Sequence, residues 1–143
     1  MGAFLVLSSL GLTACVPPGF ACSAVGYSSV AKIALAEPTA GVELELCDGA
    51  GCVPGPPMAP VEMQPARTTA EPIVEDTGVF ALVGDGVSGW SADFVGGQSV
   101  VGYRLTNTAR GVVVEGTIDV DWVRVGGTER CGGPREADIE LPS

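Results

Sequence analysis

Three carboxylates in one predicted strand are the groups of this chain best spaced for acid–base chemistry. Glu115, Asp119 and Asp121 alternate with apolar residues in the segment 112–125, so they should share one exposed face. Strand positions two apart lie about 6–7 Å apart at Cα, a separation compatible with the paired carboxylates of a glycosidase. A solvated strand face explains the same pattern, and we prefer that interpretation. No D-x-D-x-D-G calcium loop accompanies the carboxylates, so we expect no metal site.

Other catalytic arrangements lack a necessary residue. The chain has no histidine, which removes the commonest general base and the Ser-His-Asp and Cys-His arrangements. A serine–lysine hydrolase would need Lys32, the only lysine, and no S-x-x-K motif leads to it. The glycine turns at 84–86 and 96–97 are not followed by G-K-[ST], so they are not phosphate-binding loops. We therefore predict no catalytic residues, no cofactor and no enzymatic activity.

Two aromatic residues are candidates for a sugar-binding surface. Trp90 and Tyr103 each lie in a predicted strand and could together form a platform on which sugar rings stack. Each alternates with polar residues as a core-facing side chain does, so we expect both in the core.

The cysteine count points to one modified thiol. The five cysteines are Cys15, Cys22, Cys47, Cys52 and Cys131. An odd number in an exported protein indicates a free or modified cysteine, and setting Cys15 aside leaves four, enough for two disulfides. Four cysteines allow three pairings.

Cys15 follows an apolar leader. Residues 3–12 read AFLVLSSLGL, and residues 12–15 read L-T-A-C, which resembles the lipobox of a bacterial lipoprotein signal peptide. The resemblance implies that residues 1–14 are removed and that Cys15 carries a diacylglycerol and an acyl chain such as palmitate. The protein would then be anchored to the extracytoplasmic face of the cell membrane. The charged start of such a leader is missing, since the first basic residue is Lys32; an apolar N-terminal strand is the alternative.

Local geometry favours one disulfide pairing. In the segment 42–47, VELELC, apolar and polar residues alternate, so Cys47 should face outward with the glutamates. From there it can meet Cys52 across the short loop 48–51. We therefore expect Cys47–Cys52, with Cys22–Cys131 joining the start of the domain to its end. A zinc site is disfavoured because the only close pair is spaced C-x4-C and not C-x2-C.

The charge balance excludes some partners. Seventeen acidic and seven basic residues give a net charge of −10. Such a surface repels nucleic acid, so we expect no nucleic-acid partner. The part of the chain from Cys15 onward is the length of one domain.

Short alternating segments separated by glycine and proline predict an all-β fold, an antiparallel immunoglobulin-like β-sandwich of seven or eight strands. Residues 15–23 would form the anchor and a short tether, and residues 24–143 the domain. The proline-rich segment 54–72 should be a surface connection. The expected strands are 25–35, 42–47, 77–83, 87–95, 99–106, 112–125 and 137–141.

Three segments, 47–52, 116–122 and 131–134, together with the lipobox, make the chain resemble small uncharacterised actinobacterial cell-envelope lipoproteins. The resemblance implies location and anchoring but names no ligand. We therefore predict a non-enzymatic binding or scaffolding module of the envelope, held to the membrane by lipid, with an envelope protein or glycan as its partner. The alternatives are a small envelope hydrolase that uses the strand around Asp119 and Asp121, and an accessory subunit of an exported complex.

Overall fold

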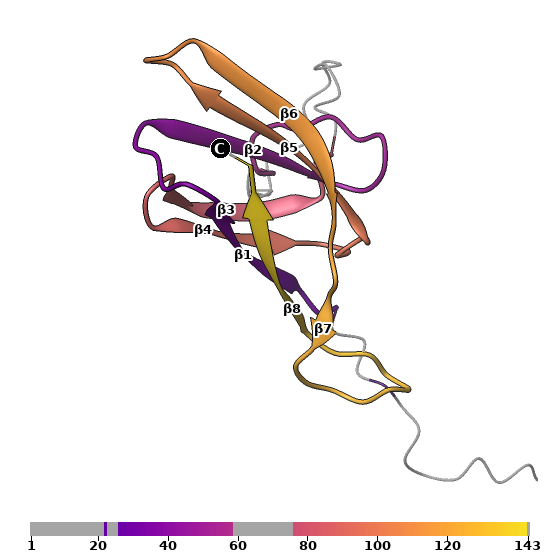
Figure 1. Ribbon diagram of the computed structural model, residues 1–143. Coiled ribbons are helices and arrows are strands. Elements are labelled where there is room, and N and C mark those ends of the chain that lie inside the picture. The colour runs from indigo at the N-terminus through magenta and orange to yellow at the C-terminus, as the bar shows by residue number, and fades with distance from the viewer. Residues whose placement is uncertain (1–21, 23–25, 59–75, 143) are drawn as a thin grey trace, which may run out of the picture.

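The protein is a two-layered assembly of β-strands. The computed structural model describes Cys22, residues 26–58 and residues 76–142, and every regular element within them is a strand. The strands form a five-stranded and a three-stranded sheet that face each other (Figure 1). This confirms the predicted all-β class. In the described part of the chain, no helix is long and apolar enough to cross a membrane.

Eight strands make up the sheets: β1 (Ser29–Leu35), β2 (Val42–Asp48), β3 (Val79–Asp85), β4 (Gly89–Phe94), β5 (Val100–Asn107), β6 (Val112–Asp119), β7 (Val123–Arg124) and β8 (Arg135–Leu141). The order is β3-β4-β1-β8-β7 in the larger sheet and β2-β5-β6 in the smaller. The leader, Cys15, most of the tether and residues 59–75 of the proline-rich segment lie outside the described residues.

The core lies between the two sheets, where the apolar residues of each strand face inward. Buried positions alternate with exposed ones along β1 and β8, as the sequence predicted. Sixteen buried side chains form a single cluster: Ala31, Ile33, Leu35, Leu44, Leu46, Val79, Trp90, Ala92, Phe94, Val101, Tyr103, Leu105, Val120, Ala137, Ile139 and Leu141. The inward placement predicted for Trp90 and Tyr103 is thus confirmed.

The prediction of a purely antiparallel sandwich is wrong at one pair of strands. β1 and β8, the first and last strands, run parallel over seven residue pairs from Ser29–Arg135 to Leu35–Leu141. All other strand pairs are antiparallel. Strands far apart in sequence are not joined by a hairpin, so the chain connection does not force an antiparallel pairing on them.

The prediction of one continuous strand over 112–125 is also wrong. β6 ends at Asp119, and β7 begins at Val123 in the other sheet. At the crossing, the Val120 amide donates to the Ser99 carbonyl (2.8 Å) and the Trp122 indole donates to the Gln98 carbonyl (2.7 Å). Burial still alternates at the crossing, where Val120 and Trp122 are less exposed than Asp119 and Asp121, whereas both residues of β7 are exposed. Periodicity alone therefore could not locate the break.

A glycine in β6 makes room for a tyrosine of β5. Gly116 lies opposite Tyr103 in the register, and a Cβ atom at Gly116 would lie 2.7 Å from the Tyr103 hydroxyl oxygen. The tyrosine ring, 7% exposed, covers the backbone that the glycine leaves bare. Pairing between β5 and β6 is continuous through Gly116, so the glycine provides close packing and does not interrupt the strand with a bulge.

Asp48, at the end of β2, fixes the loop that leads into β5. Its carboxylate accepts hydrogen bonds from the backbone amides of Gly97 (3.0 Å) and Gln98 (2.8 Å). The Asp48 amide in turn donates to the Thr77 carbonyl (2.8 Å), just before β3. One residue thus ties the smaller sheet to two loops of the larger one.

Candidate functional site

Two disulfides join the four cysteines that the structure describes. Cys22 is bonded to Cys131, with 5.3 Å between their Cα atoms, and Cys47 is bonded to Cys52, with 5.9 Å. These are the two pairings that the sequence favoured. The first links the segment before β1 to the loop between β7 and β8, and the second closes a loop directly after β2. Cys15 is the one remaining cysteine of the sequence.

Cys47 is more buried than its place in the alternation suggested. It lies on the outer face of the smaller sheet, yet it is fully buried. The reason is the segment after β2, which folds back over that face. A Cβ atom on Gly102, the residue opposite Cys47, would lie 2.6 Å from the Cys47 sulfur and 3.7 Å from Cγ of Pro54. The disulfide therefore rests on a glycine of β5, where only a residue without a side chain fits.

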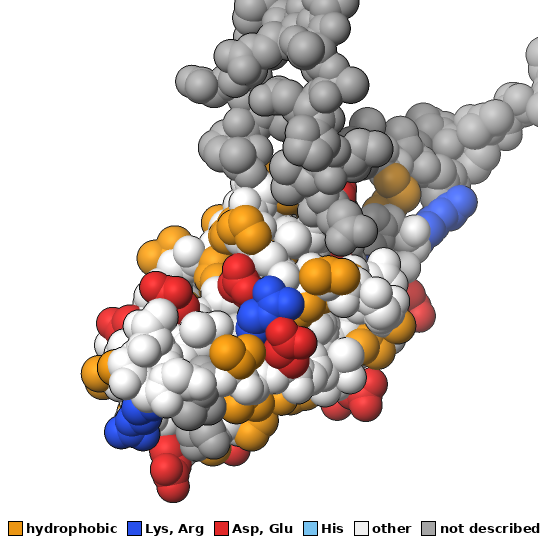
Figure 2. Space-filling view, turned by 90° about the horizontal axis from the view of Figure 1, so that it is seen from above, with side chains coloured by type: hydrophobic (Ala, Val, Ile, Leu, Met, Phe, Trp, Pro, Cys, Tyr) orange, Lys and Arg blue, Asp and Glu red, His pale blue; other side chains and the backbone are white. Residues whose placement is uncertain are grey.

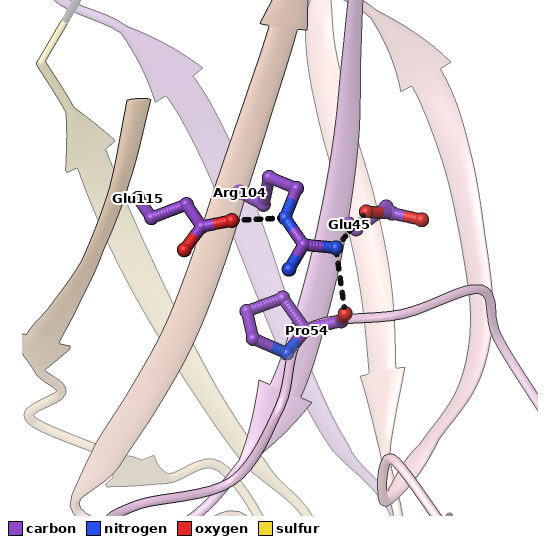
Figure 3. A network of polar contacts seen from close by, with 4 residues as sticks. All are labelled: Glu45, Pro54, Arg104 and Glu115. Carbon is purple, nitrogen blue, oxygen red and sulfur yellow. Dashed lines mark hydrogen bonds and ion pairs between the residues drawn. The ribbon is translucent and has the colours of Figure 1, made fainter. Parts of the chain in front are cut away.

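An ionic network holds the same segment in place. Arg104 of β5 bonds to Glu45 of β2 (2.9 Å) and to Glu115 of β6, its register partner on that side. Its guanidinium also donates to the Pro54 carbonyl at 3.3 Å (Figure 3). Both carboxylates raise the pKa of Arg104, the Glu115 hydrogen bond most strongly. Figure 2 looks onto this face, where a basic group lies between acidic ones.

The three carboxylates considered for catalysis do not all lie on one strand, although Glu115 and Asp119 both lie on the exposed face of β6. Glu115 is engaged with Arg104, and Asp119 is the last residue of β6. Asp121 lies beyond that strand, at the crossing between the sheets. All three are exposed. Within the described residues, no group of three or more histidine, cysteine or acidic side chains is arranged to hold a metal ion.

The proposed sugar platform is not present as an exposed surface. Trp90 and Tyr103 are each 7% exposed, so neither offers a ring face to solvent. Lys32 is exposed on the outer face of the larger sheet, beside Ser91 of β4 and Asp138 of β8 in the register.

An open cleft of about 600 Å³, which we call the inter-sheet cleft, lies between β2 and β3 and is lined by both apolar and polar groups. Both strands lie at the edge of their sheets. Leu44, Leu82 and Trp90 line it with apolar surface, and Glu43 and Asp85 add two carboxylates. The cleft therefore combines apolar side chains with two acidic ones.

Backbone hydrogen bonds close both ends of the inter-sheet cleft. At one end the Thr39 amide donates to the Gly86 carbonyl (2.7 Å). At the other end, the segment that follows β2 lies between the edges of the two sheets. Gly55 donates to a carbonyl of β2 (3.3 Å), and Met58 donates to a carbonyl of β3 (2.8 Å). The segment from Gly55 to Met58 therefore lies between the two sheets and is hydrogen-bonded to the edge strands β2 and β3.

A second, smaller cavity of about 200 Å³ lies where β1 and β5 end and β2 begins. Leu35, Leu105 and Val114 line it with apolar surface. Glu37 and Arg110, both exposed, also line it.

Sequence reasoning missed both hollows, since each is built from strands that are distant in the chain. A partial signal was available for the inter-sheet cleft. The alternation in β2 marks Leu44 as inward-facing, and proline in 54–57 marks where edge pairing must stop. Which strand lies across from β2 could not be read from these patterns.

Comparison with protein-family models, with curated proteins and with solved structures finds no match for this chain.

Proposed function

We propose that this protein is a lipid-anchored lipoprotein on the extracytoplasmic face of the cell membrane, where it acts as a non-enzymatic binding or scaffolding module of the cell envelope. The observation that carries the proposal is the cysteine pairing. Four of the five cysteines form disulfides, which persist in oxidising compartments outside the cytoplasm. The cysteine left over is Cys15, which ends the lipobox-like L-T-A-C.

The first disulfide also sets how far the domain can lie from its anchor. Cys22 follows Cys15 by seven positions, a stretch of at most about 25 Å when fully extended. Because Cys22 is bonded to Cys131, that end of the domain would stay close to the bilayer. The loop between β7 and β8 lies at one extremity of the two-layered body (Figure 1). The domain would therefore be oriented with the loop between β7 and β8 toward the bilayer.

Two features support binding in preference to catalysis. Apolar side chains form part of the lining of the inter-sheet cleft, as they do in ligand-binding sites. The two carboxylates required by the alternative hydrolase, Asp119 and Asp121, are separated by the end of β6 and are both exposed. We also propose kinship with immunoglobulin-like sandwiches, which the two facing sheets support.

The test of anchoring is the Cys15→Ser variant of the full chain, expressed in a bacterium with a lipoprotein pathway. We expect it to leave the membrane fraction for the soluble extracytoplasmic fraction, because the acceptor of the lipid is gone. Intact-mass analysis of the unaltered protein should show a diacylglycerol adduct and two disulfides. Cys22→Ser is the matched control and should remain attached. Unchanged attachment of Cys15→Ser, or an unmodified mass, would contradict the proposal.

A further inference from the structure

The free edge of β2 carries unpaired backbone groups inside the inter-sheet cleft. In a strand, the amide and carbonyl of alternate residues point to the same side. Asp48 and Leu46 bond away from β5, to Thr77 and Gly55, whereas Gly49 bonds toward β5 through the Val100 carbonyl. The alternation therefore turns the amide and carbonyl of Leu44 to the free edge. Leu44 is 7% exposed, and its backbone has no partner across this edge within the described residues.

The segment after β2 already pairs with part of this free edge, and its prolines end the pairing. Gly55 pairs with Leu46 in an antiparallel bridge. Pro56 and Pro57 follow, and proline has no amide hydrogen to donate. The ladder along β2 therefore ends one step before Leu44. The part of the β2 edge at Leu44 therefore stays unpaired within the described residues.

A second unpaired donor lines the same cleft. Trp90 is 93% buried, as its exposed fraction is 7%, and it lines the inter-sheet cleft. Its indole N–H has no hydrogen bond within the described part, in contrast to that of Trp122, which donates to Gln98. No buried side-chain nitrogen or oxygen of the described residues lacks a hydrogen-bond partner, so this N–H is accessible to solvent and can donate to a bound ligand. A bound carbonyl oxygen would supply an acceptor.

We propose that the inter-sheet cleft binds an extended peptide segment of a partner protein, which adds a short strand to the free edge of β2. The peptide backbone would pair with Leu44, one of its carbonyls would accept from the Trp90 indole, and an apolar side chain would lie against Leu82. This mode of recognition takes its affinity from backbone hydrogen bonds and its specificity from alternate side chains. The inference deepens the proposed function by naming the class of partner.

Charge complementarity selects the kind of peptide. Glu43 and Asp85 line the cleft, and the whole chain carries a net charge of −10. Hydrogen bonds from the backbone amides of Ser88 and Val87 lower the pKa of Asp85, so it stays ionised at neutral pH. A segment in which basic residues alternate with apolar ones therefore fits, and an acidic segment is repelled.

The test uses the oxidised full chain in mild detergent and a capped six-residue peptide in which lysine alternates with valine. In NMR spectra, we expect the Trp90 indole and Leu44 amide signals to shift on titration and the Leu44 amide to exchange more slowly with solvent. The same peptide with alternate backbone nitrogens methylated on the pairing side should not bind, because its donors are blocked. Equal binding of both peptides would overturn the proposal.

Variants of the cleft complete the test. Trp90→Phe keeps an aromatic ring but loses the donor, and should weaken binding about fivefold. Trp122→Phe, which removes an indole outside the cleft, should leave affinity unchanged. If Trp90→Phe unfolds, Glu43→Lys should weaken binding of the lysine peptide several-fold, and the exposed Glu136→Lys on the other sheet should not. Loss of affinity in the controls, or none in the cleft variants, would overturn the proposal.

Two further outcomes would show that something other than a partner peptide pairs with the free edge of β2. A Leu44 amide already protected in the peptide-free protein would show that another part of this chain pairs with the edge. Protection that appears only at high protein concentration, together with a dimer in sedimentation, would show a second copy. Either result would overturn the proposal. The Cys15→Ser variant separates this inference from anchoring, because it should lose membrane attachment and keep peptide binding.

Discussion

At the scale of single residues, carboxylates shape the turns of this protein. Asp85 accepts hydrogen bonds from the backbone amides of Val87 (2.8 Å) and Ser88 (2.7 Å) and so forms the turn between β3 and β4. The Asp85 side chain suits its turn because it reaches amides two and three residues away. Asp48 acts over a longer range, because the Gly97 and Gln98 amides that it accepts from lie 49 and 50 residues away in the sequence. The amides that they satisfy would otherwise face solvent at the ends of strands.

The Asp85 turn predicts a specific pH dependence. The amide bonds of Ser88 and Val87 lower the pKa of Asp85 in the folded protein, so the turn's contribution to stability is present above the unfolded value of about 3.9. That contribution is lost as the pH falls through the folded pKa. Carbon-13 NMR should give an Asp85 midpoint below about 3.9, with the urea-unfolded chain as the reference. Asp85→Asn should flatten the acid branch of the stability curve, and an equal midpoint in both states would contradict this.

At the scale of elements, side chains on neighbouring strands of the smaller sheet are complementary in size and charge on both faces of the sheet. On the outer face, the disulfide of Cys47 rests on Gly102, and Arg104 joins the two outer strands. On the inner face, the ring of Tyr103 covers Gly116. A small residue opposite a large one allows cross-strand pairs to pack without strain. These pairs hold the register of β2, β5 and β6.

The Tyr103–Gly116 pair gives a test of that register. Gly116→Ala places a methyl group 2.7 Å from the Tyr103 hydroxyl oxygen, so we expect a loss of about 1–3 kcal/mol in the free energy of unfolding, measured in urea. Combining it with Tyr103→Leu should make the penalty of the alanine smaller than it is alone. Gly26→Ala is the control, because no atom lies within 4 Å of its added methyl group. Equal stability of Gly116→Ala and the unaltered protein would refute the packing account.

At the scale of the whole molecule, the two disulfides constrain the chain very differently. Cys22–Cys131 spans 109 residues and Cys47–Cys52 only five. The chain-entropy model assigns about 5 kcal/mol to the first and about 2 kcal/mol to the second, since a longer closed loop removes more freedom from the unfolded chain. The long-range bond also joins the segment before β1 to the loop before β8, beside the parallel pair of strands.

This difference predicts the order of destabilisation. The double variant Cys22→Ser/Cys131→Ser should unfold at lower temperature than the unaltered protein by more than Cys47→Ala/Cys52→Ala does, as measured by calorimetry. Alanine is used at the second pair because Cys47 is fully buried and a hydroxyl there would add a separate cost. Adding reductant to the unaltered protein should reproduce the combined loss. The reverse order would mean that packing around Cys47 outweighs loop entropy.

The sequence by itself determined the β class, the inward residues and the disulfide pairing that we favoured. Alternation is a local property, so the buried set in strands such as Ser29–Leu35 and Arg135–Leu141 could be read directly from the order of residues. The pairing of Cys47 with Cys52 followed because only five positions separate them in the sequence. A lipobox is likewise a contiguous pattern, and the anchoring of Cys15 stays a prediction.

Only the tertiary structure decided which strands lie next to each other. It divided the segment 112–125 between two sheets, set β1 parallel to β8 and covered Cys47 with the segment after it. It also brought β2 and β3 to either side of the inter-sheet cleft. Each of these depends on contacts between residues distant in the chain. Strand alternation records only which side of a strand faces the core, and not which strand lies across from it.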